Sequence, residues 1–325
     1  MINEEKIISQ LLFDDSDLTR RLRFKIVIDA GFKLLFDHAK ENKITNPIDL
    51  DANSLFQMSL MKSLSIVKLL EGLNYVDDRN GDNLTNIMDP FTIGGIVRSQ
   101  FEAYCLFNHV FIQSKTKEEI EYKYYLWVIA GLKERQNFER SLSKSSYKGQ
   151  DSVEYTKIRA ANKIKAANEA QSILKYQKII FNNRLIQNLS PDEAEKIQSA
   201  LKKKNYQIKI ESGKVIEVRW HEMFLNSGTD EKMEETYRYL CQYSHPSNIS
   251  AFQFKDLYQK GKNHSIEMSY FVIKYSEIIM SFFTRDYCQY FLDLNKKWNT
   301  LPNIPRNVLF QNNNALRGKE FAFII

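Results

Sequence analysis

The apolar residues of this chain recur mostly at intervals of three and four, which is the spacing of one face of an α-helix. These intervals predict one or two helices within 1–40, and further helices at 54–73, 91–113, 118–142, 143–190, 191–204, 230–244 and 265–298. Apolar and polar residues alternate only at 205–220, around Ser212-Gly213, which predicts a β-hairpin, with a helix from Val215 onward as the alternative. The sequence therefore predicts an all-α fold, a helical bundle with at most one small β-hairpin.

Capping signals place the starts of several of these helices. Ser54 is the expected N-cap of the second helix, and Asp89-Pro90 supplies an N-cap and a first-turn proline for the helix 91–113. A capping box, Thr116 to Glu119, opens the helix 118–142, and Ser190-Pro191 caps the helix 191–204. Between them, residues 74–88 are dense in Asn, Asp and Gly and predict a loop.

The same pattern divides the chain into regions. Residues 1–88 are expected to form an N-terminal helical region packed on a helical core, 89–298. Within the core, 145–204 is rich in Ala, Lys and Asn with a thin apolar stripe, which predicts a projecting helical segment. The tail 299–325 holds two prolines and an Asn-rich run, so it is expected to be irregular, with its apolar end 321–325 docked on the body or on a partner.

Composition narrows the class of protein. Only 11 glycines and 6 prolines occur in 325 residues, which disfavours a β-sandwich or a doubly wound sheet. The net charge of +6, from 46 basic and 40 acidic residues, is mild for this length and would not by itself hold a polyanion. The three cysteines are widely spaced, and neither a signal peptide nor a run of 18 to 20 apolar residues is present. We therefore expect a cytoplasmic protein without a membrane span.

The candidate chemistry begins at the run from Tyr237 to Pro246. Arg238 and His245 are seven residues apart, almost two helical turns, so they project from one face. Because Pro246 follows at once, His245 is expected at the helix C-terminus, where the helix dipole favours the protonated imidazole. A guanidinium beside a titratable imidazole suits the handling of phosphate.

A second polar stripe lies on the predicted helix 91–113. Arg98, Glu102, Cys105 and His109 fall within about 60° of one another on a helical wheel. This stripe is expected to meet Arg238 and His245 across a helix–helix contact and form a pocket with them. Two alternatives stay open: an Arg98–Glu102 ion pair with a purely structural role, and a metal site made by Glu102, Cys105 and His109.

Two further groups of residues have both a structural and a nucleic-acid interpretation. Lys202, Lys203 and Lys204 end a predicted helix, where cations interact favourably with the helix dipole. The aromatic residues Tyr122, Tyr124, Tyr125 and Trp127 are able to stack bases, but their helical spacing is typical of core and interface positions. For both groups the sequence favours the structural interpretation.

The chain resembles an uncharacterised bacterial helical family in the order of a few residues. These are Arg98-x-x-x-Glu102, then Arg135, then Trp220, then Tyr237 to Ser244-His245. That family looks related to HEPN domains, the nucleotide-binding domains of higher eukaryotes and prokaryotes, and the resemblance covers residues 89–250.

This resemblance implies a metal-independent ribonuclease without a cofactor, acting on RNA or a nucleotide as a homodimer, in bacterial stress or phage defence. Arg238, His245, Arg98 and Glu102 would be catalytic, and Tyr237, Ser244 and Arg135 would bind the substrate. The alternative is a non-catalytic helical interaction or dimerisation protein. In it, Arg98, Glu102, Tyr237 and His245 would form a buried structural network.

Overall fold

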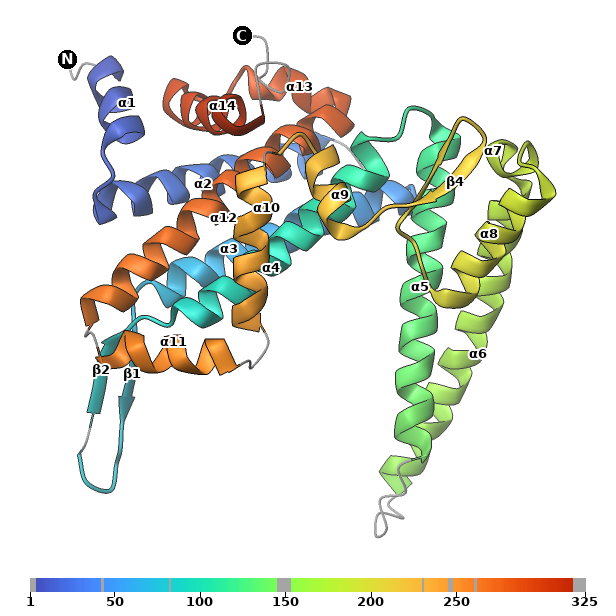
Figure 1. The fold of residues 1–325 in the computed structure, drawn as a ribbon, viewed down its shortest axis with the longest axis horizontal. Helices are drawn as coiled ribbons and strands as arrows, with labels where there is room; N and C mark the ends of the chain where they lie inside the picture. The colour runs from blue at the N-terminus through green and yellow to red at the C-terminus, as the bar shows by residue number, and fades with distance from the viewer. Residues whose placement is uncertain are drawn as a thin grey trace. The chain divides into compact units, whose positions relative to one another are not determined.

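The computed structural model describes residues 4–41, 44–81, 83–144, 153–229, 231–244, 248–259 and 262–317. It confirms the all-α class, because the described residues form helices joined by loops and by two small antiparallel hairpins (Figure 1). The chain divides into two compact units, one formed by Met1–Gln113 with Trp220–Ile325 and the other by Ser114–Arg219. No helix in the described ranges is both long and apolar enough to cross a bilayer.

The first unit is built around one long central helix, α12 (Lys262–Tyr290), which packs against α2, α3, α4 and α14. The other elements are α1 (Glu4–Phe13), α2 (Asp17–Glu41), α3 (Pro47–Leu69), β1 (Leu73–Val76), β2 (Asn83–Ile87), α4 (Pro90–Phe107), the π-helix η1 (Asn108–Ile112), α9 (Trp220–Asn226), α10 (Glu231–Ser244), α11 (Asn248–Gln259), α13 (Leu292–Trp298) and α14 (Asn303–Arg317). Aromatic rings fill its core: the ring centroids of Phe107 and Phe283 lie 4.8 Å apart, and those of Phe56 and Tyr287 lie 4.2 Å apart.

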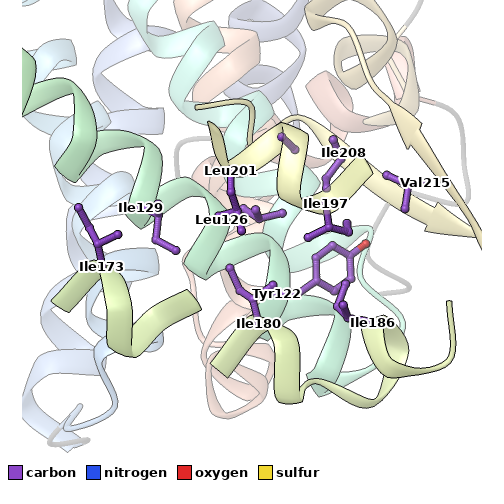
Figure 2. Close-up of a cluster of buried hydrophobic side chains, with 11 residues drawn as sticks. Tyr122, Leu126, Ile129, Ile173, Ile180, Ile186, Ile197, Leu201, Ile208 and Val215 are labelled. Carbon is purple, nitrogen blue, oxygen red and sulfur yellow. The ribbon is translucent and has the colours of Figure 1, made fainter. Parts of the chain in front are cut away.

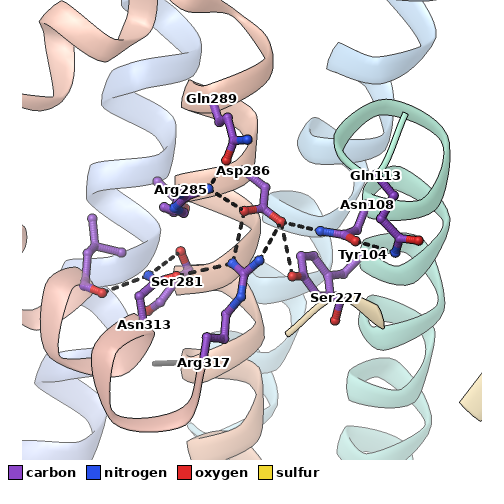
Figure 3. A network of polar contacts seen from close by, with 12 residues as sticks. Tyr104, Asn108, Gln113, Ser227, Ser281, Arg285, Asp286, Gln289, Asn313 and Arg317 are labelled. Carbon is purple, nitrogen blue, oxygen red and sulfur yellow. Dashed lines mark hydrogen bonds and ion pairs between the residues drawn. The ribbon is translucent and has the colours of Figure 1, made fainter. Parts of the chain in front are cut away.

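A buried ion pair ties α14 to the centre of this unit (Figure 3). The guanidinium of Arg317 donates to both oxygens of Asp286, over 3.0 and 3.2 Å. Tyr104, Asn108 and Arg285 also donate to this carboxylate, over 3.1, 2.7 and 3.3 Å. Both members of the ion pair are buried, so the charge of Asp286 depends on these four donors for its solvation.

The second unit contains a long helical hairpin, α5 (Lys117–Lys144) and α6 (Val153–Asn182), followed by smaller elements. These are α7 (Arg184–Gln187), α8 (Pro191–Lys203), β3 (Ile208–Glu211) and β4 (Lys214–Glu217). Tyr122 and Leu126 of α5 pack with Ile180 of α6 and Ile197 of α8 in its core (Figure 2). The hydroxyl of Tyr122 also accepts a hydrogen bond from the backbone N–H of Ile210 at 3.0 Å, so Tyr122 is a core residue rather than a base-stacking one.

Several predicted helix starts are confirmed. The carboxylate of Asp89 accepts a hydrogen bond from the backbone N–H of Phe91 at 3.0 Å. The hydroxyl of Ser190 accepts one from the backbone N–H of Glu193 at 3.4 Å. The start predicted at Ser54 is wrong, because α3 begins at Pro47 with Asn46 as its N-cap. Asn46-Pro47 combines a capping side chain with a proline in the first turn, where no intrahelical N–H bond is lost.

The β3–β4 hairpin forms at Ser212-Gly213 as predicted, since both residues adopt the positive φ that this tight turn requires. A second hairpin, β1–β2, occupies the segment that was predicted as a loop, with Tyr75 opposite Leu84 and Val76 opposite Asn83. Side chains that favour strands therefore outweigh the Asn, Asp and Gly residues, which are concentrated in the turn.

The C-terminal tail also differs from expectation. The irregular segment predicted for 299–325 contains a regular helix, α14, whose first turn includes Pro305. Proline at this position removes no intrahelical hydrogen bond, so it begins the helix instead of breaking it. Val308 and Leu309 are buried on the inner face of α14. The docking predicted for 321–325 falls outside the described residues.

Candidate functional site

The strongest polar cluster of the predicted site lies where α10 packs against α4. Glu102 is its centre: its Oε1 atom accepts from Nε of Arg98 at 3.1 Å and from the hydroxyl of Tyr237 at 3.1 Å. The guanidinium carbon of Arg98 also lies 5.9 Å from the centre of the Tyr237 ring. The structure thus brings three of the predicted site residues together.

Burial controls the chemistry of this cluster. It raises the pKa of the Tyr237 hydroxyl, and the nearby charge of Glu102 raises it further. Tyr237 therefore stays protonated at neutral pH and serves as a hydrogen-bond donor, not as a base. The ring also lies near those of Phe101 and Phe224, with centroid distances of 6.1 and 6.4 Å. The arrangement anchors α10 to α4.

Lys62 extends the same network and was not identified from the sequence. Its ammonium group hydrogen-bonds the hydroxyl of Ser99, which joins α3 to α4. Burial lowers the pKa of Lys62, while the charge of Glu102 opposes that shift. In the sequence, Lys62 stands between Met61 and Ser63, and nothing there indicates that it contacts α4.

Arg238 lies on a different face of α10 from Tyr237. Its side chain is 72% exposed and pairs with Glu234 of the same helix at 2.6 Å. Successive helical residues are rotated by about 100°. Tyr237 thus contacts α4, Arg238 faces solvent, and the hydroxyl of Tyr239 reaches the sulfur of Met268 on α12 at 3.7 Å. The Arg98–Glu102 pair meets Tyr237, and the structure does not bring Arg238 to it.

The remaining predicted residues are placed as follows. Ser244 is the last residue of α10, and His245 lies outside the described residues. Arg135 belongs to the second unit, on α5, where its guanidinium pairs with Glu169 of α6. Its side chain is 46% exposed.

The metal alternative gains no support from the described residues, which contain no group of three His, Cys, Asp or Glu side chains able to hold an ion. Burial raises the pKa of the Cys105 thiol, which opposes the thiolate form that binds metals. The backbone also changes from α-helix to π-helix at Asn108, just before His109. This change alters the spacing on which the predicted Glu102–Cys105–His109 stripe depends.

A cavity of about 530 Å³ opens between α10 and α12, within the first unit. Tyr239, Phe271 and Tyr275 supply its aromatic wall, and Lys232 and Glu235 supply its charges. The cavity therefore lies against the face of α10 that carries Tyr239, and Arg238 is on the same helix but does not line it.

No family model, curated protein or solved structure matches this chain.

We expect Tyr237→Phe to lower the free energy of unfolding by about 1 kcal/mol, because it removes one hydrogen bond to a half-buried carboxylate and keeps the ring. Urea denaturation of the full chain measures this difference. Tyr75→Phe is the matched control, because Tyr75 is an exposed residue of β1. Equal stability of the two variants would contradict an anchoring role for the Tyr237 hydroxyl.

Proposed function

We propose that this protein binds single-stranded RNA and that the Ser114–Arg219 unit supplies the binding surface. The distribution of charge between the two units carries the proposal. Ser114–Arg219 contains 22 basic and 13 acidic residues, a net charge of +9, whereas the rest of the chain contains 24 basic and 27 acidic residues, a net charge of −3. The mild total of +6 therefore conceals one strongly basic unit and one weakly acidic one.

Helix α6 concentrates this basic charge at the surface. Its exposed cations are Lys157, Arg159, Lys163, Lys165, Lys175 and Lys178, against only Glu154 and Glu169 in the same helix. Lysine and arginine side chains that neutralise phosphates release counterions, which is the main source of sequence-independent affinity for nucleic acids. The resemblance to HEPN domains favours RNA among the polyanions.

The test is the salt dependence of binding by the full chain to a fluorescent single-stranded RNA. We expect the affinity to fall steeply with salt and the combined variant Lys157→Gln, Lys163→Gln, Lys175→Gln to lower the log–log slope by about 0.7 for each lost phosphate contact. Its matched control neutralises three exposed lysines of the first unit, Lys25, Lys33 and Lys68. Salt-independent binding, or an equal effect of both combined variants, would contradict the proposal.

A second candidate function is metal-independent cleavage of the bound RNA by Arg238 and His245. The observation that favours it is the position of Arg238: its guanidinium is exposed on α10, the helix that immediately precedes His245. In this reaction the 2′-oxygen bonds to phosphorus while the bond to the 5′-oxygen breaks, which leaves a 2′,3′-cyclic phosphate. His245 would accept the 2′-hydroxyl proton, water would protonate the leaving oxygen, and Arg238 would neutralise the phosphorane.

The Arg98–Glu102–Tyr237 cluster has a supporting role in both candidates. Its charges and donors are used within the cluster, so it is suited to hold α10 in place and not to contact substrate.

The proposal includes a cytoplasmic location and a homodimer. Buried Cys105 and Cys288, both unpaired thiols, fit a reducing compartment. Exposed Met58, Met61 and Leu64 on α3 offer apolar surface for a second copy. A role in stress or phage defence rests on the resemblance alone.

A further inference from the structure

An open groove of about 530 Å³ runs between α5 and α6, within the basic unit. Val128 and Leu132 of α5 and Ile164 of α6 give it apolar walls, and Tyr176 also lines it. The Tyr176 ring is itself fixed by stacking on Tyr125, with 4.9 Å between ring centroids. Ligand pockets of this size are usually apolar with a few polar groups, and a nucleobase with its ribose fits such a space.

Glu169 is the unexpected member of this lining. Only 6% of it is exposed, and neither of its carboxylate oxygens makes a hydrogen bond of regular geometry with any described residue. Its charge is met by ion-pair contact with Arg135, whose side chain remains half exposed. Arg135 contacts only Oε1, so Oε2 has no partner among the described residues. A buried acceptor without a donor is costly, so a ligand that brings N–H groups into the groove would gain from meeting this carboxylate.

The cations of α6 are arranged unequally around the groove. On a helical wheel, Lys157, Lys165 and Lys175 lie within about 60° of the mean direction of the lining residues, while Lys163 points the opposite way. Lys165 itself lines the groove, one turn before Glu169. A ligand seated here would therefore have its anionic groups next to ammonium and guanidinium groups at the rim.

We propose that the α5–α6 groove binds an unpaired guanosine of an RNA strand. The base lies between Leu132, Ile164 and Tyr176, as unstacked bases of single-stranded RNA lie on apolar and aromatic side chains. Guanine presents two adjacent donors, N1–H and the N2 amino group, which match the two oxygens of Glu169 in a bidentate contact. Arg135 and Lys165 contact the flanking phosphates. This inference rests on the proposed RNA binding and adds a base preference to it.

The test measures binding of the full chain to oligouridine that carries one central guanosine, adenosine or inosine. We expect the guanosine strand to bind about tenfold more tightly than the inosine strand, which lacks the N2 amino group, because one hydrogen bond to a charged acceptor is lost. Glu169→Gln is expected to remove this preference. Glu134→Gln is its matched control, since Glu134 is a largely exposed acid of α5 outside the groove.

Further variants test the groove without replacing the buried Glu169, so a folding defect caused by Glu169→Gln does not affect their result. Ile164→Glu changes an exposed side chain of the groove wall and should weaken binding of the guanosine strand at least tenfold, with unchanged thermal unfolding. Lys165→Gln should weaken binding more than Lys163→Gln, which makes the same charge change on the opposite face.

The possible failures are distinguishable. Salt-dependent RNA binding with no base preference, unaffected by Glu169→Gln and Ile164→Glu, overturns the guanosine site but leaves the proposed function intact. No binding of any RNA strand, together with Glu169-dependent binding of free guanosine monophosphate, overturns the proposed function and the strand-bound guanosine alike. A guanosine preference that both groove variants abolish supports the inference.

Discussion

Arg317→Met is expected to lower the free energy of unfolding of the first unit by about 3–5 kcal/mol, because it leaves the carboxylate of Asp286 buried without its main counter-charge. Of the four donors, Arg317 alone reaches both Asp286 oxygens, whereas Tyr104 and Asn108 serve one of them and Arg285 serves the other (Figure 3). Chemical denaturation of the full chain, followed by far-UV circular dichroism, measures the loss.

Arg306→Met is the matched control for this experiment. Arg306 lies on the same helix, α14, but among the described residues its guanidinium hydrogen-bonds only Asn303 and the backbone carbonyl of Asn299 at the surface. We expect a change below about 1 kcal/mol. The double variant Arg317→Met, Asp286→Asn should recover part of the lost stability, because it removes the isolated charge. A small effect of Arg317→Met would show that water reaches Asp286.

This ion pair also shows why the tail was difficult to predict. The sequence places Arg317 shortly after an Asn-rich run and two prolines, which are local signals for irregular structure. What stabilises α14 is not local: it is the burial of Val308 and Leu309 and the pairing of Arg317 with a residue 31 positions earlier. Tertiary contacts of this kind leave no periodic trace in the sequence.

The helices that begin with a cap and a proline were predictable because the signal is local and complete. Asp89-Pro90 and Ser190-Pro191 both start helices as expected, and Asn46-Pro47 obeys the same rule, although Ser54 was assigned instead. At Ser54 the side chain hydroxyl donates to the carbonyl of Leu50, a bond available inside a helix as well as at its start. A serine before an apolar run is therefore a weaker signal than an Asn-Pro pair.

The site was predictable only in part. Arg98 and Glu102 sit four residues apart on one helix, so their ion pair follows from the spacing. Which residue of α10 would meet them depends on the rotation of α10 about its axis, and the sequence does not determine it. A rotation of about 100° separates Tyr237, which makes the contact, from Arg238. The charge difference between the two units was hidden for a related reason, because the boundaries at Ser114 and Arg219 emerge only from the fold.

Arg238→Ala is expected to lower the rate of RNA cleavage by about 100- to 1,000-fold if the second candidate function holds, because the guanidinium would stabilise charge that develops in the transition state. His245→Ala should have at least as large an effect, since it removes the proton acceptor. The assay uses the full chain and single-stranded RNA with a chelator present. The products are analysed for 2′,3′-cyclic phosphate ends.

Arg238 can be replaced with little effect on the stability of the fold. Its side chain is exposed and pairs only within its own helix, with Glu234, among the contacts of the described residues. The substitution is therefore expected to change the free energy of unfolding by less than about 0.5 kcal/mol. Lys232→Ala, on the same helix, is the control for loss of a cation.

No cyclic-phosphate product from the wild type under any salt condition would exclude cleavage of this RNA. Binding would then remain as the function, since affinity for RNA requires neither Arg238 nor His245. Cleavage that survives Arg238→Ala would instead place the reaction elsewhere in the chain.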